Sequence, residues 1–214
     1  TRPGAEPVGA EEEWRRLRPA LEAVRKEFPD VRISVDTYWS DVVRRAYDAI
    51  GDFIVNDISS GEDDPQMLPL VGRLGLTYVA MHKRGNPKTM QSMTDYEDVT
   101  SDVADYFSDF SDRAGQCGVG DWILDPGFGF AKTLEQNYQL MRDLSSFKAA
   151  FPSRRLLVGV SRKSMVYRLL GITPEESLPA TQVLHLHALQ NGADILRVHD
   201  VAQAVQTVSL YRIL

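Results

Sequence analysis

The chain alternates between short apolar runs rich in β-branched residues and longer amphipathic stretches. The apolar runs lie at residues 31–35, 53–56, 77–81, 122–124, 156–160 and 195–198. Each is nearly continuous, which is typical of parallel strands covered on both faces. The amphipathic stretches predict helices at about 10–28, 39–50, 65–74, 95–115, 134–149, 163–170, 174–191 and 200–212. Pro19 predicts a kink or a new turn inside the first helix. The alternation predicts an α/β fold with a parallel sheet.

The spacing of the strands favours a barrel over an open sheet. The predicted strands begin roughly every 33 residues, and a (β/α)8 barrel has typically ~250 residues in all. The chain opens with a polar loop and a helix and not with a strand, which is the pattern expected for a barrel without its first elements. We expect one domain, residues 1–214, that forms a (β/α)8 TIM barrel from which the first two strands and the first helix are missing. An open six-stranded doubly wound sheet is the alternative.

Composition narrows the class of protein. The 214 residues are 43% hydrophobic and 25% charged, the balance of an ordinary globular domain. A net charge of −6 disfavours general binding to nucleic acid. No apolar run approaches the ~20 residues that cross a membrane, and residues 1–7 do not resemble a signal peptide. The single cysteine, Cys117, excludes an intrachain disulfide framework. We expect a cytoplasmic protein that binds neither nucleic acid nor membranes.

Polar residues follow every predicted strand. The carboxyl ends of parallel strands meet on one face, where ligands bind. Asp36, Asn56 and Asp125 stand at three of these ends. Carboxylates and an amide can hold a divalent metal ion, accept from a ring with several N–H donors, or cap helices. We favour a binding site, and Asp57 suits helix capping better than Asn56 does.

The segment Asp125–Phe130 predicts a loop, because it holds one proline and two glycines. Its apolar residues Phe128 and Phe130 either pack on the rim of the sheet or line an aromatic pocket. Lys132 follows the loop, and we expect it to be solvated.

Cations gather at the last strand ends. Ser161–Ser164 lies between a strand and a helix, where backbone N–H groups favour an anion. Two adjacent cations at a helix start oppose the helix dipole, so they point to a ligand or an acidic partner. Arg197 and His199 share one side of an extended strand end, near the loops where barrels often bind phosphate. With Arg2, they form a candidate diphosphate-binding site.

These motifs, in this order, resemble those of the dihydropteroate synthase family. They are Ser34–Thr37, Asn56–Ser59, Met81–His82, Leu124–Phe130, Gly159–Ser164 and Arg197–Val201, preceded by Thr1–Ala5, which resembles the family's second barrel loop. The resemblance covers the whole chain. It implies a transferase of folate biosynthesis that joins 6-hydroxymethyl-7,8-dihydropterin diphosphate to p-aminobenzoate, giving 7,8-dihydropteroate and diphosphate.

The resemblance also implies a role for each site residue. The pterin would be bound by Asp36, Asn56, Met81, Asp125, Lys163 and Arg197. The diphosphate would be bound by Thr1, Arg2, Arg197 and His199, and p-aminobenzoate by Pro3, Phe130, Lys163 and Ser164. Catalysis would rest on Arg2, Lys163, Arg197 and His199. The family further implies Mg²⁺, with an Asn ligand upstream of residue 1, inhibition by sulfonamides, and a homodimer.

Three other functions remain open at this point. A methyltetrahydrofolate-binding methyltransferase barrel would use the same carboxylates but does not need a diphosphate-binding site. A non-catalytic or truncated pterin-binding module would bind without turnover. A metal-dependent aldolase-type barrel would use Asp36 and Asp125 as metal ligands and would not bind a pterin.

Overall fold

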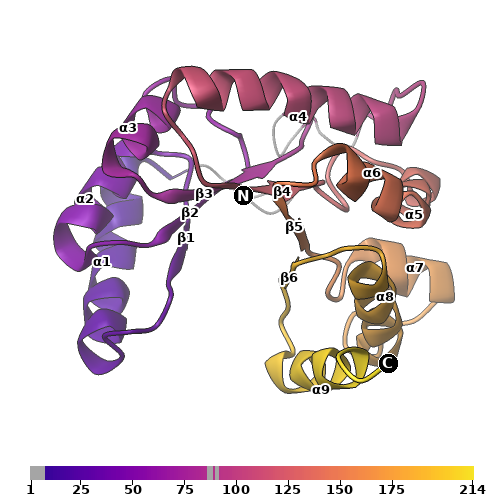
Figure 1. Cartoon of the computed structure of the whole chain (residues 1–214). Coiled ribbons are helices and arrows are strands. Elements are labelled where there is room, and N and C mark those ends of the chain that lie inside the picture. Colours follow the sequence, from indigo (N-terminus) through magenta and orange to yellow (C-terminus); the bar gives the residue numbers. More distant parts are fainter. Residues whose placement is uncertain (1–7, 86–88, 90–91) are drawn as a thin grey trace. The chain divides into compact units, whose positions relative to one another are not determined.

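The computed structural model describes residues 8–85, 89 and 92–214 (Figure 1). Its contacts divide the chain into two compact units. Unit 1 holds the chain up to Met81 together with Ser108–Ile123, and unit 2 holds His82–Phe107 together with Leu124–Leu214.

Unit 1 is built on three parallel strands. They are β1 (Ser34–Asp36), β2 (Ile54–Asp57) and β3 (Thr77–Met81), and Val55 lies opposite both Val35 and Tyr78. The helices α1 (Ala10–Glu27), α2 (Ser40–Ile50) and α3 (Met67–Leu74) lie along these strands on one side (Figure 1). Pro19 lies inside α1, which continues through it as one helix, so the chain does not start a new element there.

The core of unit 1 combines aliphatic and aromatic side chains. One side of α2 is fully buried, through the side chains of Val42, Val43 and Ala46. The rings of Tyr78 and Phe110 stack with centroids 5.9 Å apart, and Trp122 meets Phe110 edge-on at 4.9 Å. Such aromatic pairs stabilise beyond their area burial, by about 0.5–1.5 kcal/mol each. They connect β3 to the second half of α4 (Val99–Gln116).

Unit 2 contains the later strands and most of the later helices. The strand β4 (Trp122–Asp125) begins in unit 1 and ends in unit 2, where β5 (Arg155–Val158) pairs in parallel with β6 (Ile195–Leu196). The helices are α5 (Leu134–Arg142), α6 (Leu144–Ala150), α7 (Ser164–Leu170), α8 (Leu178–Gln190) and α9 (Val201–Tyr211).

The predicted helix at 134–149 is in fact two helices. A capping box between Thr133 and Gln136 starts α5, and the chain leaves the helical path at Asp143. The Asp143 carboxylate accepts a hydrogen bond from Thr100 Oγ1 at 2.9 Å. Asp143 therefore ends one helix and precedes the next.

The prediction of a parallel α/β fold is confirmed, with six strands that follow one another in the sheet in chain order. The strands β1, β5 and β6 are shorter than the apolar runs that predicted them. β1 alternates between exposed and buried positions, so the expectation that both faces of every strand are covered is wrong for it. In the described part of the chain, no helix is long and apolar enough to cross a membrane.

Candidate active site

In unit 1, the strand ends bring Asp36 and Asn56 together. β1 and β2 pair in register at these residues, and Asn56 Nδ2 donates to Asp36 Oδ1 at 3.2 Å. Asp36 is exposed and Asn56 is half-buried. Carboxylate and amide oxygens are hydrogen-bond acceptors, so this pair can receive the N–H groups of a planar ring.

The neighbouring Asp57 has a structural role, but it holds a turn and does not cap a helix, because the next helix, α3, starts only at Met67. Its carboxylate accepts from Tyr78 Oη at 2.6 Å, from both Ser59 N and Ser59 Oγ at 2.7 Å, and from Gly61 N at 2.9 Å. Burial raises the pKa of Asp57, while these hydrogen bonds oppose the rise. The turn that follows Asn56 is therefore held by hydrogen bonds to the buried Asp57 carboxylate.

Met81 ends β3 and is 2% exposed. Its carbonyl accepts from Ser60 Oγ at 3.0 Å, so the same turn also holds the end of β3.

In unit 2, Asp125 and Arg197 form an ion pair. The Asp125 side chain is 1% exposed, whereas the Arg197 side chain is 39% exposed, and Arg197 Nη2 donates to Asp125 Oδ2 at 2.6 Å. Gly127 N donates to the other oxygen at 3.0 Å. A buried carboxylate thus orients a partly exposed guanidinium, a group whose planar N–H donors suit an anion.

Lys163 stands beside this pair at the start of α7. Its Nζ donates to Phe128 O and lies 4.9 Å from the centroid of the Phe130 ring. Burial lowers the pKa of Lys163 to about 8, with Asp125 opposing and Arg197 adding to the shift. Phe128 is fully buried and packs, whereas Phe130 stays half-buried beside the lysine. Packing in the core is therefore confirmed for Phe128, and the part of Phe130 in a ligand pocket stays a prediction.

The loops after β5 and β6 hold each other in place. Ser161 Oγ accepts from His199 N at 3.2 Å and lies 3.0 Å from His199 Nδ1. If the hydroxyl donates its proton to Nδ1, the neutral ring carries its proton on Nε2, where it can meet an anion. Arg162 makes two hydrogen bonds to Asp200, at 2.8 and 2.6 Å. Arg162 therefore has the acidic partner that its place beside Lys163 indicated.

The remaining predicted residues fall into two groups. Ser164 is the first residue of α7 and is half-buried. Thr1, Arg2 and Pro3 lie outside the described residues.

The prediction that Lys132 is solvated is wrong, because its side chain is 4% exposed. Nothing near it in the sequence signals this burial, because one of its partners, His82, lies 50 residues away.

The described residues do not supply a metal centre by themselves. Among them, no group of three or more His, Cys, Asp or Glu side chains is placed to hold a metal ion. Asp36 and Asp125 are each engaged by a nitrogen donor, Asn56 in the first case and Arg197 in the second.

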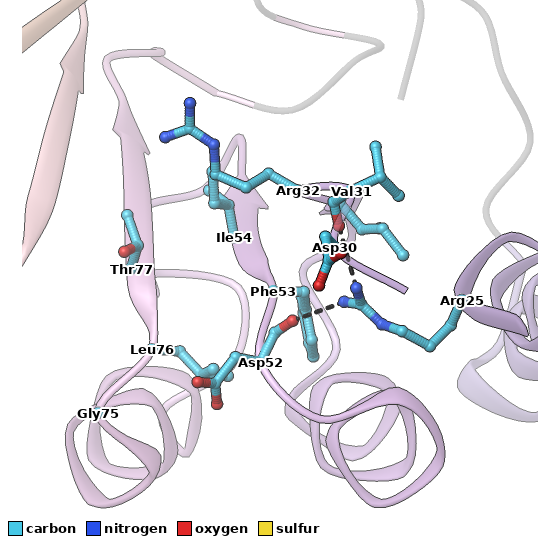
Figure 2. A pocket seen from close by; sticks show the side chains of 11 residues that line it. Arg25, Asp30, Val31, Arg32, Asp52, Phe53, Ile54, Gly75, Leu76 and Thr77 are labelled. Carbon is cyan, nitrogen blue, oxygen red and sulfur yellow. Dashed lines mark hydrogen bonds between the residues drawn. The ribbon is translucent and has the colours of Figure 1, made fainter. Parts of the chain in front are cut away.

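A hollow of about 290 Å³ lies at the opposite, amino ends of the unit 1 strands (Figure 2). Arg25 reaches into it and donates to the carbonyl oxygens of Ile50, Pro29, Val31 and Asp52 at 2.7–3.1 Å. These contacts join the end of α1 to the segments that lead into β1 and β2. The guanidinium is used by the fold, and this hollow is not a candidate site.

Comparison with known proteins identifies the family. The family model described as pterin binding enzyme matches residues 1–199. The dihydropteroate synthase of Synechocystis sp. is 44% identical over 210 residues, which cover 96% of this chain and 71% of that protein. The dihydropteroate synthase of Escherichia coli is 42% identical over 210 residues, covering 97% of this chain and 73% of that protein.

Solved structures agree with these relatives. A Yersinia pestis dihydropteroate synthase in a sulfonamide drug complex superposes with a TM-score of 0.91 at 36% identity, covering 99% of this chain and 76% of that one. A Thermus thermophilus dihydropteroate synthase in complex with 4-aminobenzoate has a TM-score of 0.91 at 37% identity, covering 100% of this chain and 80% of that one. The chain belongs to the pterin binding enzyme family, among its dihydropteroate synthases.

Proposed function

We propose that this chain performs the dihydropteroate synthase reaction with the residues described above in distinct roles. The bond between the exocyclic carbon of the pterin and the diphosphate oxygen breaks, and the diphosphate leaves with the electron pair. The amine nitrogen of p-aminobenzoate forms the new C–N bond and then loses a proton. Because the resulting anilinium is acidic, no strong general base is required, and we assign none.

Asp36 and Asn56 are proposed to accept hydrogen bonds from the N–H edge of the pterin. Their registered positions at the ends of β1 and β2 and their 3.2 Å hydrogen bond support this role. Met81 is proposed to contact the pterin ring. Tyr78 and Ser59 act indirectly, because they hold Asp57 and so the turn after Asn56.

The ion pair of Asp125 and Arg197 is the observation that carries the assignment. The Asp125 carboxylate is 1% exposed and orients the guanidinium, which is proposed to meet the departing diphosphate. Asp125 is also proposed to accept from the pterin. Lys163 is proposed to reach the oxo side of the pterin, and His199 to donate from Nε2 to the diphosphate. Phe130, Lys163 and Ser164 are proposed to bind p-aminobenzoate, where sulfonamides would compete.

Several expectations stay proposals. Mg²⁺ would help neutralise the diphosphate, but the described residues offer no three-ligand site, so no step here is assigned to the metal. Roles of Thr1 and Arg2 on the diphosphate and of Pro3 on p-aminobenzoate rest on the family resemblance alone. We also propose that the six strands belong to an eight-stranded barrel and that the protein acts in the cytoplasm.

We further propose a homodimer formed through α8 and α9. These neighbouring helices carry exposed apolar side chains at Val183, Val201, Val205 and Leu210, each at least 58% exposed. His185 and Leu189 of α8 are buried within unit 2 and do not contribute to this surface. Light scattering after size exclusion tests the state, and Val205→Lys should shift it toward monomer.

Isothermal titration tests the function directly. The protein is titrated with the pterin diphosphate and Mg²⁺, and p-aminobenzoate is then added while released diphosphate is measured. Pterin binding followed by diphosphate release establishes the synthase. Asp125→Asn should lose most of both signals, whereas Asp109→Asn, an exposed carboxylate on α4, should keep them.

The other outcomes separate the alternatives. Pterin binding without diphosphate release would indicate a binding module. The absence of pterin binding by the folded protein would contradict the site assignment.

A further inference from the structure

Lys132 is a buried cation underneath the loop that carries Phe130. Its Nζ lies 3.0 Å from His82 Nδ1, 3.1 Å from Gly127 O and 3.2 Å from Phe130 O. An ammonium group has three donors and no acceptor. These three partners therefore use its full hydrogen-bonding capacity, and two of them are carbonyl groups of the same loop.

The surroundings of Lys132 disfavour its protonated form, and only Asp125 among the charged groups supports it. Burial lowers the pKa of Lys132 to about 7, and the cations Lys163 and Arg84 lower it further, whereas Asp125 opposes the shift. Burial also lowers the pKa of His82 to about 2, so the imidazole is neutral and Nδ1 can accept. A buried cation is costly for stability unless its partners are well placed. Packing alone gives no reason for a lysine here.

The loop is held on its other sides as well. Asn137 Oδ1 accepts from Gly129 N at 2.7 Å, and Asn137 Nδ2 donates to Lys132 O at 3.2 Å. A Cβ at Gly127 would lie 2.0 Å from His82 O, so the backbone passes too close for any side chain. The chain between Gly127 and Phe130 is thus positioned by a few directed contacts, of which Lys132 supplies two.

We propose that Lys132 is a positioning residue for the arylamine substrate. Its ammonium holds the carbonyls of Gly127 and Phe130, which sets the place of the Phe130 ring beside Lys163. Lys132 itself touches no reacting atom. This inference rests on the proposed function, because it takes Phe130 as part of the p-aminobenzoate site.

Lys132→Met keeps an unbranched apolar side chain of similar length to the lysine stem and removes the ammonium. We expect the KM for p-aminobenzoate to rise about tenfold, because misplacing a binding group by a fraction of an ångström has effects of that order. The KM for the pterin diphosphate should stay within about twofold. Hydrogen exchange of the loop amides 127–131 should quicken about tenfold, while exchange in α5 stays unchanged.

The pH profile gives a readout that a merely structural lysine would not move. Wild-type KM for p-aminobenzoate should rise as the pH increases through about 7, where Lys132 loses its proton. The groups that face this ammonium are His82, Asp125, Lys163 and Arg84. In Lys132→Met the change near pH 7 should vanish, whereas any change near pH 8 due to Lys163 should persist.

Lys148→Met is the matched control. Lys148 is a half-buried lysine of unit 2 that pairs with Asp194 at 3.0 Å, away from the loop. Its removal should leave both KM values within about twofold. If Lys132→Met does not fold, His82→Gln and the wild-type pH profile carry the test, and the KM for p-aminobenzoate should then rise about threefold.

Two results would overturn the inference. One is a folded Lys132→Met with wild-type KM for p-aminobenzoate and unchanged loop exchange. The other is an equal loss of kcat/KM for both substrates, which would indicate general loosening. If the wild-type protein itself shows no turnover, the proposed function fails, while the exchange comparison still tests whether Lys132 holds the loop.

Discussion

Gly159 follows β5 and leaves the space that the Arg197 guanidinium occupies. A Cβ added there would lie 3.0 Å from Nη2, 3.1 Å from Nε and 3.3 Å from Cζ of Arg197. The same Nη2 donates to Asp125 at 2.6 Å, so the guanidinium is held where the methyl group would go. Gly159 is not among the residues with positive φ, and Gly159→Ala therefore tests crowding without backbone strain.

The expected cost follows from these contacts. Crowding a packed site costs about 1–3 kcal/mol, and a hydrogen bond to a charged partner contributes about 1.5–3 kcal/mol. The Arg197 side chain is 39% exposed and can give way in part. We therefore expect a loss of about 1–2 kcal/mol in transition-state stabilisation. In kcat/KM for the pterin diphosphate this is a decrease of about 5- to 30-fold.

Steady-state kinetics with both substrates, together with pterin affinity, test this expectation. The control is Gly115→Ala inside α4, where the added Cβ meets no described atom within 4 Å. It should leave activity unchanged and raise stability by up to about 1 kcal/mol. In an Arg197→Met background, Gly159→Ala should cost nothing further. Wild-type kcat/KM in Gly159→Ala, or an undiminished effect of the alanine in the Arg197→Met background, would contradict the proposed crowding of Arg197.

Three other predictions follow from buried or paired charges. Tyr78→Phe removes a 2.6 Å hydrogen bond to the buried Asp57 and should lower the free energy of unfolding by about 1.5–3 kcal/mol in urea; a change below about 0.5 kcal/mol would contradict it. Lys163 is protonated below its pKa of about 8 and neutral above it, so pterin affinity should fall as pH rises from 7 to 9.5, and a flat profile would argue against its contact with the pterin. Arg162→Met breaks the ion pair with Asp200 and should raise the KM for the pterin diphosphate about 3- to 10-fold, with the KM for p-aminobenzoate as the internal control.

The strand pattern of this fold could be read from the sequence because it depends on near neighbours. The run 77–81 was predicted as a strand and β3 spans those same residues. The helix predicted at 134–149 failed at one point, because the break at Asp143 coincides with a contact to Thr100, which is distant in sequence. Local periodicity carries no information about such a contact.

In the candidate site, too, some features followed from the sequence and others depended on distant contacts. Parallel strands bring their carboxyl ends to one edge, so Asp36 and Asn56 were expected to meet, and their side chains do. For the cations, the residue type was only a partial guide. An acidic partner or a ligand was expected near Arg162, and the structure shows Asp200, whereas Lys132 is buried where solvation was expected.

The order of the amino acids is enough to predict the α/β pattern, the polar strand ends and, through the motifs, the family. Which charges are buried, what they bind and which protonation states they favour depends on the folded chain, because desolvation and pairing act through space. Asp125 and Arg197 are 72 residues apart in the chain, and His82 and Lys132 are 50 apart. Only the fold brings each pair within hydrogen-bonding distance.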